Sequence, residues 1–160
     1  MRNNSTLLLG LWRHVTLGVV LTAVIGSGHA ATFEDVLAPL QTATEKCRPI
    51  DGVHASSSQA RSLYEKEGLA KTLNLEPVHK VYKSFECGGS KSTVYLYEYA
   101  SPPEGVKAMA GIQTYIWGGR RRSGHHPEFI FTVENVVVVV SGYRPKEAAN
   151  ILATSHGVEP

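Results

Sequence analysis

The chain has little cysteine and no long apolar run. Only two of its 160 residues are cysteines, which is too few for a disulfide-dense scaffold or a four-cysteine zinc site. A membrane-spanning helix needs about 20 apolar residues, and no stretch of that length is both apolar and uncharged, which excludes a multi-span membrane protein. Hydrophobic residues at 42% and charged residues at 19% are typical of one globular domain.

Motifs of covalent and cofactor chemistry are missing as well. There is no Gly-X-Ser-X-Gly elbow and no Ser-X-X-Lys pair, and there is no phosphate loop or dinucleotide fingerprint. The only aspartates are Asp35 and Asp51, both near the N-terminus. Glu86, Glu98 and Glu134 have no partner carboxylate that the pattern places beside them. Nucleophilic catalysis is therefore without support, and the sequence predicts no cofactor.

The first thirty residues have the pattern of an export signal. Arg2 and Arg13 precede the uncharged stretch 15–26, which is too short to cross a bilayer. Gly28 and Ala30 fit the small-residue positions of a cleavage site, which predicts a cut after Ala30. An uncleaved anchor is the alternative, and no nearby cysteine supports a lipid-modified terminus. We expect an exported protein, periplasmic or extracellular, with no membrane span after signal removal.

Removing this segment changes the charge balance. The whole chain has 16 Lys and Arg against 14 Asp and Glu, a formal net charge of +2. Both residues of the excess, Arg2 and Arg13, lie in the predicted signal, so the mature chain is formally neutral. A neutral domain gives no electrostatic argument for a nucleic-acid partner or an anionic membrane.

The rest of the chain divides into a helical N-terminal segment, 31–76, and a sheet-and-helix core, 77–160, of one domain. Thr32, followed three residues later by an acid, predicts a helix start, and Pro39 should end or kink that helix. A second helix is predicted over 59–67.

Two strand–strand–helix units make up the predicted core. They are strands at 78–86 and 92–99 with a helix over 102–116, then strands at 128–133 and 136–140 with a helix over 144–156. Ser101 and Glu104 predict a capping box for the first helix, and Glu134 with Asn135 predicts a two-residue hairpin turn. Five consecutive valines, 136–140, indicate a central strand or one covered on both faces. The predicted class is α+β: a four-stranded antiparallel sheet with helices on one face, plus the N-terminal helical segments.

A resemblance accompanies this pattern. The run VYLYEYAS at 94–101, the helix and tryptophan after it, and the run ENVVVVV at 134–140 are similar to small bacterial exported proteins and lipoproteins of unknown function. Those proteins pair a VYEYAS-like strand with a helix and a later GNLIVLY-like strand. The resemblance covers about half of the chain, which departs from it in lacking a lipobox and in having an arginine-rich loop. It implies a fold and a compartment, and no activity.

The two cysteines, Cys47 and Cys87, both lie in the part predicted to be exported. An oxidising compartment favours a disulfide between them, which would close a loop of about 41 residues and stabilise the chain by roughly 4 kcal/mol. Free thiols and a reactive pair are the alternatives, and no Cys-X-X-Cys spacing supports the latter.

The most distinctive local feature is a run of three arginines and two histidines: Arg120, Arg121, Arg122, His125 and His126. Guanidinium groups in a glycine-flanked loop can hold a phosphate, sulfate or carboxylate, and the adjacent Trp117 can stack on a ring or on an arginine. The alternative is a solvated loop. A metal site made from these histidines with His54 or His79 lacks the usual ligand spacing, so no metal is predicted.

Alternation along the strand 92–99 places Tyr95, Tyr97 and Tyr99 on one face. If that face is open, it is an aromatic platform for peptides, sugars or bases. The alternative is a packing face inside the protein.

Two classes of function follow from these features. The first is a non-enzymatic exported binding or accessory domain that acts through the sheet face or the arginine loop. The second is a small enzyme or anion-binding protein that uses the loop of Arg120–Arg122 and His125–His126. The lack of a recognisable nucleophile or metal set favours the first class. The partner is left open, and the free edges of a four-stranded sheet also allow a homodimer through a sheet edge.

Overall fold

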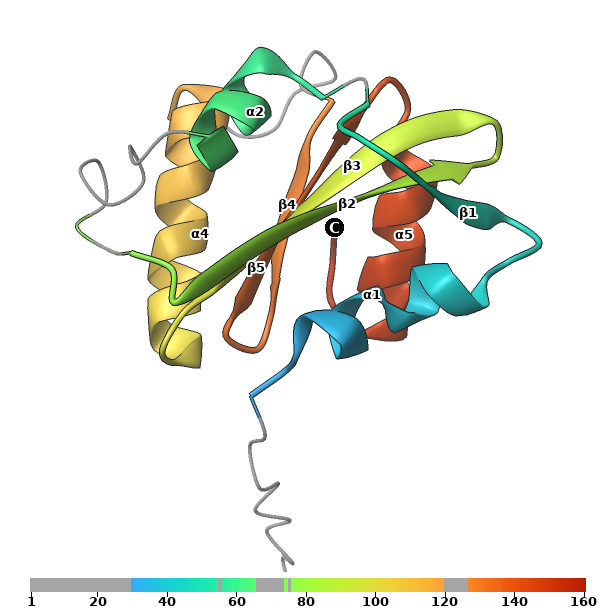
Figure 1. Cartoon of the computed structure of the whole chain (residues 1–160). Helices are drawn as coiled ribbons and strands as arrows, with labels where there is room; N and C mark the ends of the chain where they lie inside the picture. The colour runs from blue at the N-terminus through green and yellow to red at the C-terminus, as the bar shows by residue number, and fades with distance from the viewer. Residues whose placement is uncertain (1–29, 55, 66–73, 75, 120–126) are drawn as a thin grey trace, which may run out of the picture.

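The computed structural model describes residues 30–54, 56–65, 74, 76–119 and 127–160. A five-stranded sheet in the order β1-β2-β3-β5-β4 runs through their middle, with every neighbouring pair antiparallel (Figure 1). The elements are α1 (Phe33–Thr42), β1 (Cys47–Ile50), α2 (Ser58–Glu65), β2 (His79–Cys87), β3 (Ser90–Glu98), α4 (Pro102–Trp117), β4 (Phe129–Val133), β5 (Val136–Gly142) and α5 (Lys146–Ser155). The predicted α+β class is confirmed.

The sheet has one strand more than predicted. The additional strand, β1, lies in the segment 31–76 that the sequence pattern assigned to helices and irregular chain. It pairs with the last four residues of β2, from Cys47 opposite Cys87 to Ile50 opposite Ser84. A proline, Pro49, is tolerated there because β1 is an edge strand and one of its sides needs no hydrogen-bond donor.

Helices cover both faces of the sheet, so the predicted one-sided layer is wrong. One core lies between the sheet and α1 with α5, and a second core lies between the sheet and α2 with α4 (Figure 1). Val136, Val138 and Val140 belong to the first core, whereas Val137 and Val139 belong to the second. A run of valines presents an apolar side chain to both faces, and both must then be covered. The prediction of a strand that is central or covered on both faces is confirmed in its second form, because β5 lies between β3 and the edge strand β4 and its valines belong to both cores.

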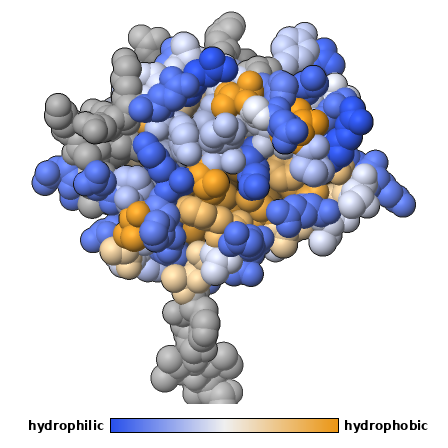
Figure 2. Space-filling view, in the orientation of Figure 1, coloured by the Kyte–Doolittle hydropathy of each residue, from blue (hydrophilic) through white to orange (hydrophobic). Residues whose placement is uncertain are grey.

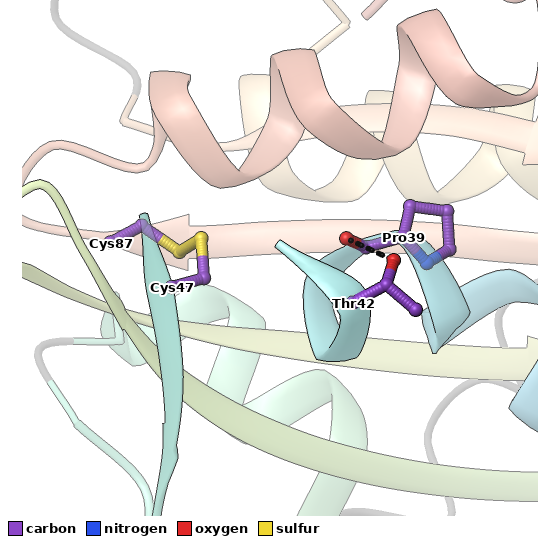
Figure 3. The surroundings of a disulfide bond; sticks show 4 residues. All are labelled: Pro39, Thr42, Cys47 and Cys87. Carbon is purple, nitrogen blue, oxygen red and sulfur yellow. Dashed lines mark hydrogen bonds between the residues drawn. A yellow bond between two sulfur atoms is a disulfide. The ribbon is translucent and has the colours of Figure 1, made fainter. Parts of the chain in front are cut away.

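The first helix starts as predicted and ends later. Thr32 and Asp35 form the capping box, because each side chain accepts a hydrogen bond from the backbone N–H of the other residue. Pro39 does not end the helix, which continues to Thr42. The Thr42 hydroxyl donates to the carbonyls of Ala38 at 2.9 Å and Pro39 at 3.3 Å, the second of which is drawn in Figure 3.

Both hairpins have two-residue turns. Gly88 and Gly89 join β2 to β3 with φ of 55° and 74°, a left-handed conformation that glycine adopts without strain. Glu134 and Asn135 join β4 to β5 as predicted. The Asn135 amide donates to the carbonyl of Tyr99 at 2.9 Å, which fixes this hairpin to the chain just before α4.

The long helix α4 begins without the predicted capping box. Ser101 is the N-cap residue in an extended conformation, but its side chain makes no capping hydrogen bond. Gly105 instead allows a close approach, since a Cβ there would lie 3.3 Å from the backbone of Asn135. Neither α4 nor any other helix in the described part of the chain is long and apolar enough to span a membrane.

The first core is not closed completely at its rim. Figure 2 shows apolar side chains gathered in the middle of the face that is seen in Figure 1. Partly buried hydrophobic residues pack against the first core, namely Ala31, Phe33, Val81, Ile151 and Val158. The described part of the molecule therefore has an apolar surface on the side of α1 and α5.

Candidate functional site

The arginine–histidine run lies outside the described residues: Arg120, Arg121, Arg122, His125 and His126. Its neighbour Trp117 is the last residue of α4. The Trp117 side chain is 8% exposed and packs in the second core. Buried in this way, the indole does not present a face to solvent on which a ligand could stack.

The three strand tyrosines share one face, and that face is covered. Tyr95, Tyr97 and Tyr99 are at most 1% exposed and belong to the core beneath α2 and α4. The Tyr95 hydroxyl donates to Oγ of Ser56 at 2.7 Å, whereas the hydroxyls of Tyr97 and Tyr99 have no hydrogen-bond partner among the described residues. Burial raises the pKa of Tyr99 to about 12 and raises the pKa of Tyr97 as well. These side chains form a packing face and not an open aromatic platform.

Three buried hydroxyl residues beside the tyrosines form hydrogen bonds to the segment before α2, which the sequence did not suggest. Ser84, Thr93 and Ser141 lie side by side on β2, β3 and β5 and are buried. Thr93 Oγ1 accepts from the backbone N–H of His54 at 3.0 Å and donates to its carbonyl at 3.1 Å. Ser141 Oγ accepts from the N–H of Ser57 at 3.0 Å. The hydroxyls thus hold the chain before α2 against the sheet, a structural role.

The predicted disulfide is present. Cys47 and Cys87 are directly opposite each other on β1 and β2, with their Cα atoms 4.1 Å apart and their sulfurs bonded (Figure 3). The N–H of Gly88 donates to the carbonyl of Lys46 at 3.1 Å, so the bonded cysteines occupy a non-hydrogen-bonded position of the ladder, where side chains are closest. Next to them Arg48 binds the Glu86 carboxylate at 2.7 Å.

An open groove lies beside this disulfide. Its volume is about 630 Å³. One wall is the end of α1 and the turn after it, from Pro39 through 42–46, and the other wall is α5. The α5 wall presents Asn150, Ile151, Thr154 and Ser155. Leu40 and Leu152, on the inner sides of the two helices, are fully buried in the first core, which fixes the position of both walls.

The groove continues toward the glycine hairpin. Lys46, Asn150 and Ile151 also line a second hollow of about 490 Å³, which reaches Gly88 and Ser90. The helix start contributes the charged side chains Arg144, Lys146 and Glu147 to this hollow. We call this end of the groove, formed by Lys46, Arg144 and Lys146, the basic end.

The charges at the basic end are not neutralised within the described residues. The three cations come from two separate places in the chain, the turn before β1 and the start of α5, and none forms an ion pair with a described carboxylate. Glu147 packs directly over the hairpin turn, since a Cβ on Gly88 would overlap its carboxylate. The hollow thus has three positive charges and one negative charge.

Comparisons with protein-family models, with curated proteins and with solved structures find no match to this chain. The candidate site therefore stands on its geometry. It consists of a groove that two helices hold in place, with a hydroxyl- and amide-lined wall and a basic end.

Proposed function

We propose that this chain is an exported binding or accessory protein without catalytic activity, and that the groove between α1 and α5 is its binding surface. The observation that carries the proposal is the groove itself. Its volume of about 630 Å³ is within the range of ligand sites, which is roughly 300–1,000 Å³. Its walls are fixed before any ligand arrives, so binding there costs little ordering of the protein.

The compartment is supported by two independent features. Residues 1–30 carry the charge, apolar stretch and small residues of an export signal. The disulfide between Cys47 and Cys87 is the form of a cysteine pair that persists in oxidising compartments. N-terminal sequencing of protein recovered outside the cytoplasm of a bacterial host is expected to begin at Ala31. An intact Met1 on that protein would contradict cleavage.

The binding surface is tested by cross-linking in the native compartment. A photoreactive benzoylphenylalanine replaces Ser155 in the groove or, as a control, Val106, an exposed residue of α4. We expect a discrete cross-linked product from position 155 and none from position 106. The product from position 155 should be lost when Thr154→Trp is added to the same protein, because the indole fills the groove.

A second variant tests the alternative, in which the arginine run carries binding instead of the groove. A triple variant with alanine at Arg120, Arg121 and Arg122 tests whether that loop carries binding. If the partner is lost from this variant and kept by Thr154→Trp, the groove is not the binding surface and the alternative of an anion-binding loop replaces it.

A further inference from the structure

We infer that the groove binds an extended acidic peptide segment of a partner protein, with a carboxylate of that segment at the basic end. This inference rests on the proposed function and adds the chemical class of the ligand. Lys46, Arg144 and Lys146 line one hollow with the single carboxylate of Glu147. Glu45 lines the other part of the groove, so the two hollows together carry three positive and two negative charges. The positive excess is therefore concentrated at the basic end.

The fold positions the backbone of Lys46 and the guanidinium of Arg144. The Lys46 carbonyl accepts from Gly88 at 3.1 Å, and the next residue, Cys47, is bonded to the same hairpin. Arg144 lies with its guanidinium 5.3 Å from the ring centre of Tyr143, which restricts its orientation. A cation that is already oriented, as Arg144 is, loses less conformational freedom when it binds a carboxylate, and an arginine adds paired hydrogen bonds.

The rest of the groove suits a peptide backbone. Asn150 and Thr154 lie one helical turn apart on α5, with Ser155 beside them and Thr44 on the opposite wall. Hydroxyl and amide side chains donate and accept, as the N–H and C=O groups of an extended backbone require. Ile151 belongs to both hollows and gives an apolar contact for one side chain. A free inorganic anion would use only the basic end, and a lipid chain would leave the polar wall unpaired.

The test starts from short random peptides displayed on phage and selected against the mature, disulfide-bonded chain. Selected sequences are expected to be enriched in Asp and Glu. For a selected peptide, replacing its acids by Asn and Gln should weaken binding about 5-fold or more in fluorescence anisotropy, and added salt should weaken the acidic peptide only.

Charge-removing variants locate the carboxylate. Two variants are compared, Lys46→Gln and the double variant Arg144→Gln with Lys146→Gln. Each should weaken binding of the acidic peptide about 3- to 10-fold and leave binding of its neutral counterpart unchanged. The matched control is Lys83→Gln combined with Lys107→Gln, which removes two exposed lysines of β2 and α4 outside the groove. That control should bind both peptides as the parent chain does.

The outcomes separate this inference from the proposed function. If Thr154→Trp abolishes binding of selected peptides that show no acidic preference, the acidic ligand is refuted and the groove stands. If selected peptides bind equally well to Thr154→Trp, both are refuted. If inorganic phosphate or phosphatidylglycerol vesicles bind with the same dependence on Lys46, Arg144 and Lys146 while no peptide does, the ligand is an anion of that kind and the peptide is refuted.

Discussion

Two neighbouring tyrosines on one strand face differ in what their hydroxyls meet. Both residues are fully buried. Tyr95 donates to Ser56, whereas the hydroxyl of Tyr97 has no hydrogen-bond partner in the described part of the chain. A hydrogen bond of this kind contributes about 1 kcal/mol to stability, while a buried polar group without a partner costs about 1–3 kcal/mol. Removing the hydroxyl should therefore destabilise the protein at position 95 but not at position 97.

We predict that Tyr95→Phe lowers the free energy of unfolding by about 1 kcal/mol and that Tyr97→Phe leaves it unchanged or raises it by a similar amount. Urea denaturation followed by fluorescence measures both. A loss at Tyr97 equal to that at Tyr95 would mean that the Tyr97 hydroxyl has a bound water or another partner inside the core.

The buried phenols also predict a loss of stability at alkaline pH. An unfolded tyrosine releases its proton near pH 10, whereas burial raises the pKa of Tyr99 to about 12 and raises that of Tyr97 too. Between these values the unfolded chain binds fewer protons than the folded chain, so the free energy of unfolding falls as the pH rises. The stabilisation is complete below pH 10 and is lost as the pH passes through the folded pKa.

Urea denaturation midpoints measured from pH 9 to 12 should fall as the pH rises. Tyr99→Phe should make this decrease with pH less steep. Tyr143→Phe, which changes a tyrosine that is 74% exposed, is the control and should leave the slope as it is in the parent chain. Equal slopes for all three proteins would show that Tyr99 does not contribute.

The elements illustrate what local pattern can predict. The apolar runs, the two hairpins and the α1 cap are encoded by neighbouring residues, so the sequence located β2 to β5 and the helices within a few positions. β1 is a four-residue strand that contains Pro49 and has no alternation of its own. It exists because β2 offers a free edge and Cys47 is bonded to Cys87, and both conditions come from 40 residues further along the chain.

In the pairing of β3 with β5, position 142 must be glycine because the neighbouring backbone leaves no room for a side chain. It lies opposite Ser92 in the β3–β5 ladder, and a Cβ there would lie 2.6 Å from the carbonyl oxygen of Lys91. We predict that Gly142→Ala destabilises the protein by about 1–3 kcal/mol, the range for overpacked interiors.

Gly105→Ala is the contrasting variant. Its Cβ would meet the Asn135 backbone at 3.3 Å, and alanine gains up to about 1 kcal/mol of helix propensity, so the net change should stay within about 1 kcal/mol. Thermal unfolding of the two variants compares them directly. A Gly142→Ala protein as stable as the parent would show that the β3–β5 pair can separate locally.

At the scale of the whole molecule, the two-sided cover and the groove both depend on which helices meet. The valine run indicated a doubly covered strand, yet the sequence pattern did not show that α4 and α5 pack on opposite faces. The groove forms only because α1, from the N-terminal segment, packs beside α5. Lys46 and Arg144 are almost a hundred residues apart in the sequence, so no local motif could have predicted the basic end.

The disulfide covalently links the N-terminal segment to the sheet next to the groove. Its loop spans 40 positions, for which the chain-entropy relation gives roughly 4 kcal/mol. Cys47→Ser combined with Cys87→Ser should therefore lower the free energy of unfolding by about that amount, and the reduced parent protein should match the double variant. Urea denaturation with and without reductant gives both values.

The bond constrains α1 and β1 more than β3 to β5, so hydrogen exchange in the variant should rise first in residues 33–50. Uniform exchange across the sheet would show instead that the molecule unfolds as one unit when the bond is absent, and that the groove wall is no weaker than the core behind it.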